Sequence, residues 1–169
     1  MSIVNRAAIE DFEKILVKRK CEPAIVIRRK FFRVVFRQPL ISDMTISAIK
    51  GKSINVGNTK VLIKNTGPGG LCFISNIKLP VGKDFILQFT TQLAGKKLRV
   101  YGYCVWMEIR DDNLYEYGVE LILDEDGRSY LVKDLNKVQI NMKNNILFDT
   151  GSCFSGSPRL FFKQFSDSR

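Results

Sequence analysis

The segment KVLIKNTGPGGLCFI, residues 60–74, is the most informative about the fold. Its first part, 60–64, carries β-branched and aliphatic side chains, and its last part, 71–74, is apolar, so both predict strands. Between them lies Asn65-Thr66-Gly67-Pro68-Gly69-Gly70, whose glycines and proline predict a tight turn. The stretch is therefore expected to form two antiparallel strands joined by a glycine turn.

Strand-like runs recur on both sides of this hairpin at short intervals. They occupy residues 24–37, 41–49, 53–56, 84–91, 98–109 and 114–123. Six or seven short strands joined mostly by hairpin-like turns predict a mainly β fold, an antiparallel barrel or sandwich. The period then changes, because residues 124–140 begin with acids and place apolar side chains on one face. They predict a helix with Asp124 as its N-cap.

The two ends of the chain differ from this central part. Residues 6–20 have helical apolar spacing with acids first and bases last, which predicts a short amphipathic helix or ordered arm. We expect an N-terminal arm over 1–23, a barrel with its helix over 24–142, and an aromatic tail over 143–169. The tail mixes Asn, Gly and Ser with five phenylalanines, and it either packs these rings on the domain or binds a partner.

The charge of the chain indicates an anionic partner. The 169 residues carry a formal net charge of +10, and residues 1–40 contribute +6 of it. Such an excess favours nucleic acid, a nucleotide, a phospholipid or an acidic protein surface as the partner. A basic surface that merely keeps the protein soluble is the alternative.

Several classes of protein are disfavoured by what the sequence lacks. The chain has no histidine, and its four cysteines are widely spaced without a C-x-x-C pair, which predicts free thiols in a reducing cytoplasm and no structural zinc. No phosphate-binding loop, nucleophile elbow or other catalytic set is present, so we expect neither an enzyme nor a cofactor. No apolar run approaches the length of a membrane span, and the N-terminal segment, with acids at Glu10, Asp11 and Glu13 and no long apolar run, does not suit a secretory signal.

A second informative segment, Arg28-Arg29-Lys30-Phe31-Phe32-Arg33, precedes the glycine turn by some thirty residues. Its guanidinium groups suit planar, bidentate partners such as phosphate oxygens and the O6/N7 edge of guanine. The glycine turn offers backbone N–H groups that a bulky anion can approach without meeting a Cβ atom. Together the two segments predict a site for a guanine-containing phosphate ligand.

These two segments resemble the PilZ domain family, whose pattern is R-x-x-x-R followed by (D/N)-x-S-x-x-G. Arg29 to Arg33 fits the first element, and Asn65 to Gly70 fits the second. The stretches GYCVW, 102–106, and YGVEL, 117–121, also resemble the family's late strand pair, so the resemblance covers about residues 24–140. It implies a six- to seven-stranded antiparallel PilZ-type β-barrel with a C-terminal helix, without catalysis.

The resemblance further implies that the chain binds cyclic di-GMP (c-di-GMP), alone or as a stacked dimer. Arg29 and Arg33 would grip guanine edges and phosphates with the help of Arg28. Asn65 would hydrogen-bond a guanine edge, and Gly70 would let the turn close on the ligand. The implied ligand-binding residues are Arg28, Arg29, Arg33, Asn65, Gly67, Gly69 and Gly70. Residues 1–27 would then rearrange and relay the signal to an unknown protein partner.

One position departs from the family pattern. The serine of the second element is Gly67 here, so a hydroxyl that could contact the ligand is missing. Loss of one neutral hydrogen bond costs about 1 kcal/mol, which weakens affinity several-fold without abolishing it. We therefore expect a weaker binder, and tighter binding by a Gly67→Ser variant.

Two other functions remain open. A degenerate PilZ module would bind no nucleotide and serve only in protein–protein interaction, although such members tend to lack the arginines that this chain keeps. A small barrel that binds nucleic acid is the weaker alternative, because the aromatics of 101–106 form no known RNA-binding signature.

Overall fold

The structure is a computed structural model that describes residues 30–144 and 153–166. The chain divides into two compact units, Met1–Phe31 and Phe32–Arg169, and the fold is that of the second unit. The helix expected at 6–20 and the first part of the strand expected at 24–37 lie outside the described residues.

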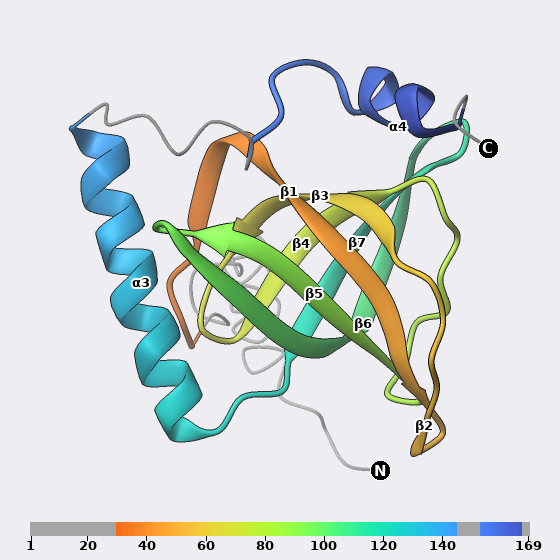
Figure 1. Cartoon of the computed structure of the whole chain (residues 1–169), viewed down its shortest axis with the longest axis horizontal. Helices are drawn as coiled ribbons and strands as arrows, with labels where there is room; N and C mark the ends of the chain where they lie inside the picture. The colour runs from red at the N-terminus through yellow and green to blue at the C-terminus, as the bar shows by residue number, and fades with distance from the viewer. Residues whose placement is uncertain (1–29, 145–152, 167–169) are drawn as a thin grey trace, which may run out of the picture. The chain divides into compact units, whose positions relative to one another are not determined.

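Seven antiparallel strands form a single sheet in the order β2-β1-β3-β4-β7-β6-β5 (Figure 1). Strand β1 also pairs with β5, so six strands close into a ring and β2 extends its edge. The strands are β1 Val34–Ile49, β2 Lys52–Ser53, β3 Thr59–Thr66, β4 Gly70–Ser75, β5 Phe85–Leu93, β6 Lys96–Asp111 and β7 Leu114–Leu121. The mainly β, antiparallel fold that the sequence predicts is confirmed.

The interior of the ring is filled by alternate residues of its strands. In β5, Leu87, Phe89 and Leu93 are buried, as the period of two predicts. Aromatic rings pack around this layer, with the centroid of Phe73 5.1 Å from those of Phe89 and Tyr117. The Tyr117 hydroxyl is satisfied by backbone groups of the loop after β4, so the ring can be buried without loss of a hydrogen bond.

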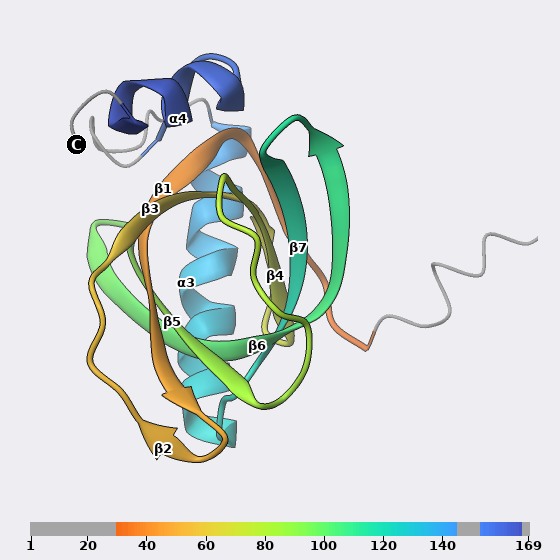
Figure 2. The same ribbon diagram turned by 90° about the vertical axis from the view of Figure 1, so that its right-hand side faces the viewer.

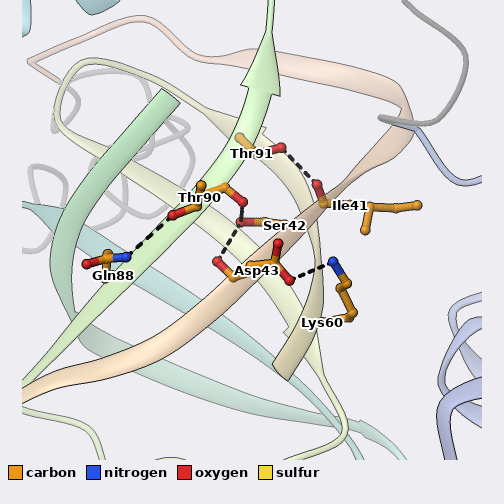
Figure 3. A network of polar contacts seen from close by, with 7 residues as sticks. All are labelled: Ile41, Ser42, Asp43, Lys60, Gln88, Thr90 and Thr91. Atoms are coloured by element: carbon orange, nitrogen blue, oxygen red, sulfur yellow. Dashed lines mark hydrogen bonds and ion pairs between the residues drawn. The ribbon is translucent and has the colours of Figure 1, made fainter. Parts of the chain in front are cut away.

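Hydrogen bonds from side chains stabilise the pairing of β1 with β5, which closes the ring. Figure 3 shows the Ser42 hydroxyl donating to the Thr90 carbonyl, at 3.1 Å, and the Thr91 hydroxyl donating to the Ile41 carbonyl, at 2.8 Å. Ser42 is fully buried, so this bond avoids the cost of an unmet hydroxyl. On the neighbouring strand, Lys60 pairs with Asp43 at 2.6 Å.

Strand β1 corrects the prediction of separate strands at 24–37 and 41–49. It is one strand from Val34 to Ile49 that continues through Pro39. Its pairing with β3 shifts register between Val35 and Leu40, and this irregularity accommodates a residue that has no N–H to donate.

Two helices follow the sheet in the described part of the chain, and the first is the one predicted at 124–140. Helix α3, Glu125–Lys143, begins at its N-cap Asp124, whose side chain accepts from the Gly127 N–H at 2.7 Å. Figures 1 and 2 show α3 lying along the ring. Its buried residues Leu131, Leu135 and Val138 join the interior cluster.

The second helix, α4, Pro158–Ser166, lies in the tail that the sequence left unassigned. Its Phe161 and Phe162 are buried against an outer apolar cluster that includes Leu62, Ile74 and Leu114. The described part of the tail thus packs aromatic rings on the domain, the first of the two interpretations. Figure 2 shows α4 over one end of the strands, apart from most of α3.

Candidate functional site

One row of residues runs across the outer face of five paired strands, from β1 through β3, β4 and β7 to β6. Consecutive members are Cα partners in the sheet, and the row is Val35, Asn65, Cys72, Gly118 and Trp106. We call it the Asn65 row. Its two ends are apolar and accessible, because Val35 is 67% exposed and Trp106 is 39% exposed.

Two β-bulges place the key side chains of this row on the outer face. Ile63 points into the interior, and strict alternation would send Asn65 there too, but the β3–β4 register shifts between these residues. A second shift, between Cys104 and Trp106, turns the tryptophan outward although Cys104 is interior. Bulges of this kind are common beside functional sites, since they redirect a side chain.

Trp106 lies directly over Gly118 of the neighbouring strand. A Cβ atom built at Gly118 would stand 1.9 Å from the indole Nε1, so only glycine leaves room for the ring. No functional role was predicted for Trp106, because its pairing depends on a bulge that strand periodicity does not reveal. A glycine opposite the single tryptophan of the chain is the signal that could have identified it.

Asn65 has an unmet hydrogen-bonding group. Its Oδ1 atom is buried and has no hydrogen-bond partner among the described residues. An unpaired buried acceptor costs about 1–3 kcal/mol, so such groups are rare and call for an explanation. A ligand that donates an N–H group to this oxygen would remove the cost.

The two motif segments meet at Gly67. Val34 pairs with Thr66, which brings the preceding Arg33 opposite Gly67. A Cβ atom at Gly67 would stand 2.2 Å from the carbonyl oxygen of Phe32 and 3.3 Å from the Arg33 Cγ atom. Arg33 is also close enough to Cys72 for its charge to oppose the rise of the thiol's pKa. Arg33, Asn65 and the turn therefore share one side of the sheet.

This contact is an argument against the expectation that serine at position 67 would simply add a hydrogen bond. The atom nearest to the added Cβ belongs to the backbone, which cannot turn aside as a flexible side chain can. The turn is closed from within as well, since the Gly67 N–H donates to the Gly70 carbonyl at 2.8 Å. That N–H group is therefore not open to an anion, contrary to the simplest interpretation of the glycine turn.

The remaining glycines of the turn have structural partners. The Gly69 carbonyl accepts from the Leu121 N–H at 3.0 Å. A Cβ atom at Gly70 would stand 2.5 Å from the Val119 carbonyl oxygen, so this glycine is required by the close approach of β4 to β7. Arg28 and Arg29 lie outside the described residues.

A buried ionic cluster is centred on Glu116, two residues along β7 from Gly118 of the Asn65 row. Glu116 of β7 is 5% exposed, and its carboxylate accepts from Lys64 Nζ at 2.9 Å, from Cys72 Sγ at 3.1 Å and from Arg110 Nε. We call these four residues the Glu116 cluster. Burial alone would raise the pKa of the Glu116 carboxyl. The three hydrogen bonds outweigh burial and lower the pKa to about 2.

Cys72 belongs to the Asn65 row, and its thiol donates a hydrogen bond to Glu116. Burial, followed by the hydrogen bond to Glu116, raises the pKa of Cys72 to about 12, so it remains a neutral donor. The sequence predicted a buried free thiol but missed its acidic partner, because neither glutamate of the strand LYEYGVEL gives any sign of three donors from other strands.

Within residues 30–144 and 153–166, no group of histidine, cysteine, aspartate or glutamate side chains could hold a metal ion. No helix in the same ranges is long and apolar enough to cross a membrane.

Comparison with known proteins identifies the family. The PilZ domain family matches residues 27–136, which is more than half of the chain. No curated protein matches the sequence. Among solved structures, YcgR from Escherichia coli in complex with c-di-GMP is similar with a TM-score of 0.52 and 11% identity, over 70% of this chain and 49% of that chain.

A second structure, the MrkH–c-di-GMP complex of K. pneumonia, is similar with a TM-score of 0.52 and 15% identity, over 70% of this chain and 55% of that chain. The present chain thus spans about half the length of either protein. At these identities the two structures support the fold, and the family match supports the assignment. This protein belongs to the PilZ domain family.

Proposed function

We propose that this protein is a cyclic di-GMP receptor whose ligand lies over the Asn65 row. The unmet Asn65 Oδ1 atom carries the proposal, because guanine presents N–H donors on its Watson–Crick edge. The family is non-catalytic, which confirms that the protein is not an enzyme. Two proteins that share the fold, YcgR and MrkH, were solved in complex with c-di-GMP.

The other groups near this row suit the same ligand. The Arg33 guanidinium would make charge-assisted bonds to a phosphate or to guanine O6 and N7, joined by Arg28 and Arg29. Trp106 would give a purine an aromatic surface at the far end of the row. One ligand or a stacked pair would thus be held between basic and aromatic groups.

The receptor would act through a partner. Ligand binding would draw in the arginines that precede β1, and the arm over residues 1–23 would rearrange with them. The changed arm would present a different surface to a downstream protein. The same reasoning makes the arginines, rather than the turn, the main source of affinity.

A degenerate module that binds no nucleotide is the second candidate. The observation that favours it is the filled turn, where the Phe32 backbone occupies the space that a side chain at position 67 would need. A nucleic-acid binder is the third, favoured only by the net charge of +10. Its affinity would fall steeply with salt and would not require guanine.

Calorimetric titration with cyclic di-GMP tests the proposal. We expect saturable binding by the wild type and a loss of at least about 100-fold for the Arg29→Ala/Arg33→Ala variant, because two charge-assisted bonding groups are removed. The matched control is Lys97→Ala/Arg99→Ala, which removes equal charge from the exposed start of β6. Cyclic di-AMP serves as the ligand control.

The outcomes separate the three candidates. Absence of heat with the wild type at high ligand concentration would exclude the receptor and leave the interaction module. Equal affinity in the Arg29→Ala/Arg33→Ala variant would show that the site is elsewhere. Tight, salt-sensitive binding of single-stranded RNA by the wild type, unaffected by cyclic di-GMP, would favour the nucleic-acid binder.

A further inference from the structure

A pocket of about 550 Å³ opens on the outer face, where the β6–β7 hairpin approaches the first turn of α4. Three apolar residues, Ile74, Leu114 and Pro158, line it together with three cationic residues, the acidic Asp111 and the polar Ser157. The cations, Lys64, Arg110 and Arg159, come from three different elements, β3, β6 and α4. The pocket is therefore built by the tertiary fold and not by one local motif.

The cations retain bonding capacity. Arg110 gives its Nε to Glu116, and Arg159 gives one terminal nitrogen to Asp111. Each guanidinium has five N–H donors, so most of them remain available to an incoming anion. The Arg110 and Arg159 side chains are 46% and 65% exposed, which leaves their terminal nitrogens accessible. The three cations form ion pairs with two carboxylates, Glu116 and Asp111, and Glu108 also acts on Arg110, so the pocket offers guanidinium N–H donors rather than a large excess of positive charge.

The N-terminus of α4 does not supply the anion-binding groups. The Leu160 N–H and the Phe161 N–H both donate to the Ser157 carbonyl, at 3.0 and 3.2 Å, and position 158 is proline. The positive character of the pocket therefore comes from its side chains.

The lining indicates which anion would fit. No aromatic side chain of residues 30–144 and 153–166 lines the pocket, so these residues offer a nucleobase no stacking surface there. Aliphatic and proline side chains next to guanidinium groups instead suit a short peptide in which an apolar residue stands beside a carboxylate. A volume of about 550 Å³ is large enough for a few side chains of such a peptide.

We propose that this pocket docks an acidic segment of a partner protein, with Arg110 and Arg159 gripping a carboxylate and Ile74 and Leu114 receiving the adjacent apolar side chain. The proposal deepens the proposed function, since it names a surface through which the receptor would meet its partner. It does not require nucleotide to be bound, because none of its contacts involves Arg33 or Asn65.

The pocket also has a physical connection to the Asn65 row. Lys64 lines the pocket and immediately precedes Asn65, and Lys64 and Arg110 share Glu116 with Cys72 of the row. The two surfaces are neighbours on one face of the sheet, about 7 Å apart along the strands. A bound partner would therefore lie beside the nucleotide.

Selection of random 12-residue peptides displayed on phage, with the full chain as bait and no nucleotide, tests the proposal. We expect enrichment of peptides with Asp or Glu next to Leu, Ile, Val or Met. The best peptide is then synthesised with a fluorescent label, together with its amide counterpart in which Asp becomes Asn and Glu becomes Gln. Anisotropy titrations should show at least about tenfold weaker binding of the amide form, as loss of a charged bidentate pair requires.

Substitutions of pocket residues test whether the peptide binds in the pocket. Arg159→Gln, at an exposed position, should weaken binding about five- to tenfold, and Arg110→Gln should do the same if thermal unfolding shows that the variant is folded. The matched controls Lys97→Gln and Arg99→Gln, at the other end of β6, should change affinity less than about twofold, since exposed charges far from the site act weakly.

Three results would overturn the proposal. These are failure of acidic peptides to be enriched, equal binding of the acidic and amide peptides, and unchanged affinity in Arg159→Gln. The nucleotide site is tested separately by the Arg29→Ala/Arg33→Ala variant, which should keep its affinity for the peptide. Loss of peptide binding in that variant would mean that the peptide occupies the nucleotide site, which also overturns the docking proposal. A wild type that binds the peptide but no cyclic di-GMP would reject only the receptor function.

Discussion

Two buried polar groups lie close together on the outer face of this sheet, and they differ in how many hydrogen bonds they accept. In the Glu116 cluster, the carboxylate of Glu116 is buried and accepts three hydrogen bonds from three other strands. In the Asn65 row, the buried Oδ1 atom of Asn65 accepts none from the described residues. The two positions are linked by Cys72, which pairs with Asn65 in the sheet and donates to Glu116.

The two groups therefore differ in what completes their hydrogen bonds: other strands for Glu116, and the proposed ligand for Asn65. A buried charge destabilises a protein unless it is fully paired, and Glu116 meets that condition. An unmet acceptor is tolerated where a ligand restores the hydrogen bond, and Asn65 stands beside Arg33 at such a place. We therefore expect Glu116 to contribute to stability and Asn65 to contribute to ligand binding. Loss of binding in a stable Glu116 variant, or loss of stability without loss of binding in an Asn65 variant, would refute the comparison.

The largest effect is expected from Glu116→Gln. The folded-state pKa of about 2 lies below the ordinary value of 4.5, so the charged carboxylate stabilises the fold at every pH above about 4.5. We expect the free energy of unfolding at pH 7 to fall by ~3 kcal/mol in the variant. The wild type should lose this advantage as the pH drops from 4.5 to 2, so the two unfolding curves should converge. Urea unfolding at pH 7, 4 and 2.5 measures both.

The control for this prediction is Asp43→Asn, which removes a carboxylate from an ion pair of similar length. Lys60 and Asp43 are each 41% exposed, so the loss should stay below about 1 kcal/mol at any pH. Cyclic di-GMP affinity of Glu116→Gln should change less than about threefold, since Glu116 lies outside the Asn65 row. A stable Glu116→Gln variant that no longer bound the nucleotide would show that Glu116 serves ligand binding and not stability.

Sequence patterns predicted the fold well because β-branched, aliphatic and aromatic runs separated by turn residues mark the strands. Alternation places Leu87, Phe89 and Leu93 inside the ring, and acids followed by one apolar face gave helix α3 with its N-cap Asp124. The tail helix α4 was missed. Its phenylalanines are spaced irregularly over the tail, and the helix is stabilised by an outer cluster from three other elements.

Only part of the candidate site could be predicted from the sequence, because the rest depends on pairing between strands. Arg33 and the turn from Asn65 to Gly70 are continuous segments, so their chemistry can be inferred directly from the sequence. Trp106 and Glu116 depend on which residues face each other across strands. The bulge at Trp106 reverses its face, and a one-residue shift of this kind leaves no trace in local periodicity.

The next effect in size concerns the turn beside Asn65. Gly67→Ser should weaken cyclic di-GMP binding about tenfold or more, because the new Cβ would meet the Phe32 carbonyl oxygen and push the segment that carries Arg33 out of position. Calorimetric titration measures the change. Gly57→Ser is the matched control, since no atom lies within 4 Å of a Cβ built there. Tighter binding by Gly67→Ser would show that the backbone yields and that the missing hydroxyl had limited the affinity.

The smallest effect on stability, and the most informative contrast with Glu116, is expected from Asn65→Ala. Removal of a buried acceptor that has no partner should leave the free energy of unfolding unchanged or raise it by up to about 1 kcal/mol. The same change should weaken cyclic di-GMP binding about tenfold, since one hydrogen bond to the guanine edge is lost. Asn65→Asp keeps the acceptor oxygen and should bind within about threefold of the wild type, as either residue fits the family pattern. The fluorescence of Trp106, the single tryptophan of the chain, reports binding in the same row. A clear loss of stability in Asn65→Ala, with unchanged affinity, would make Asn65 a structural residue and remove the main support for a nucleotide over this row.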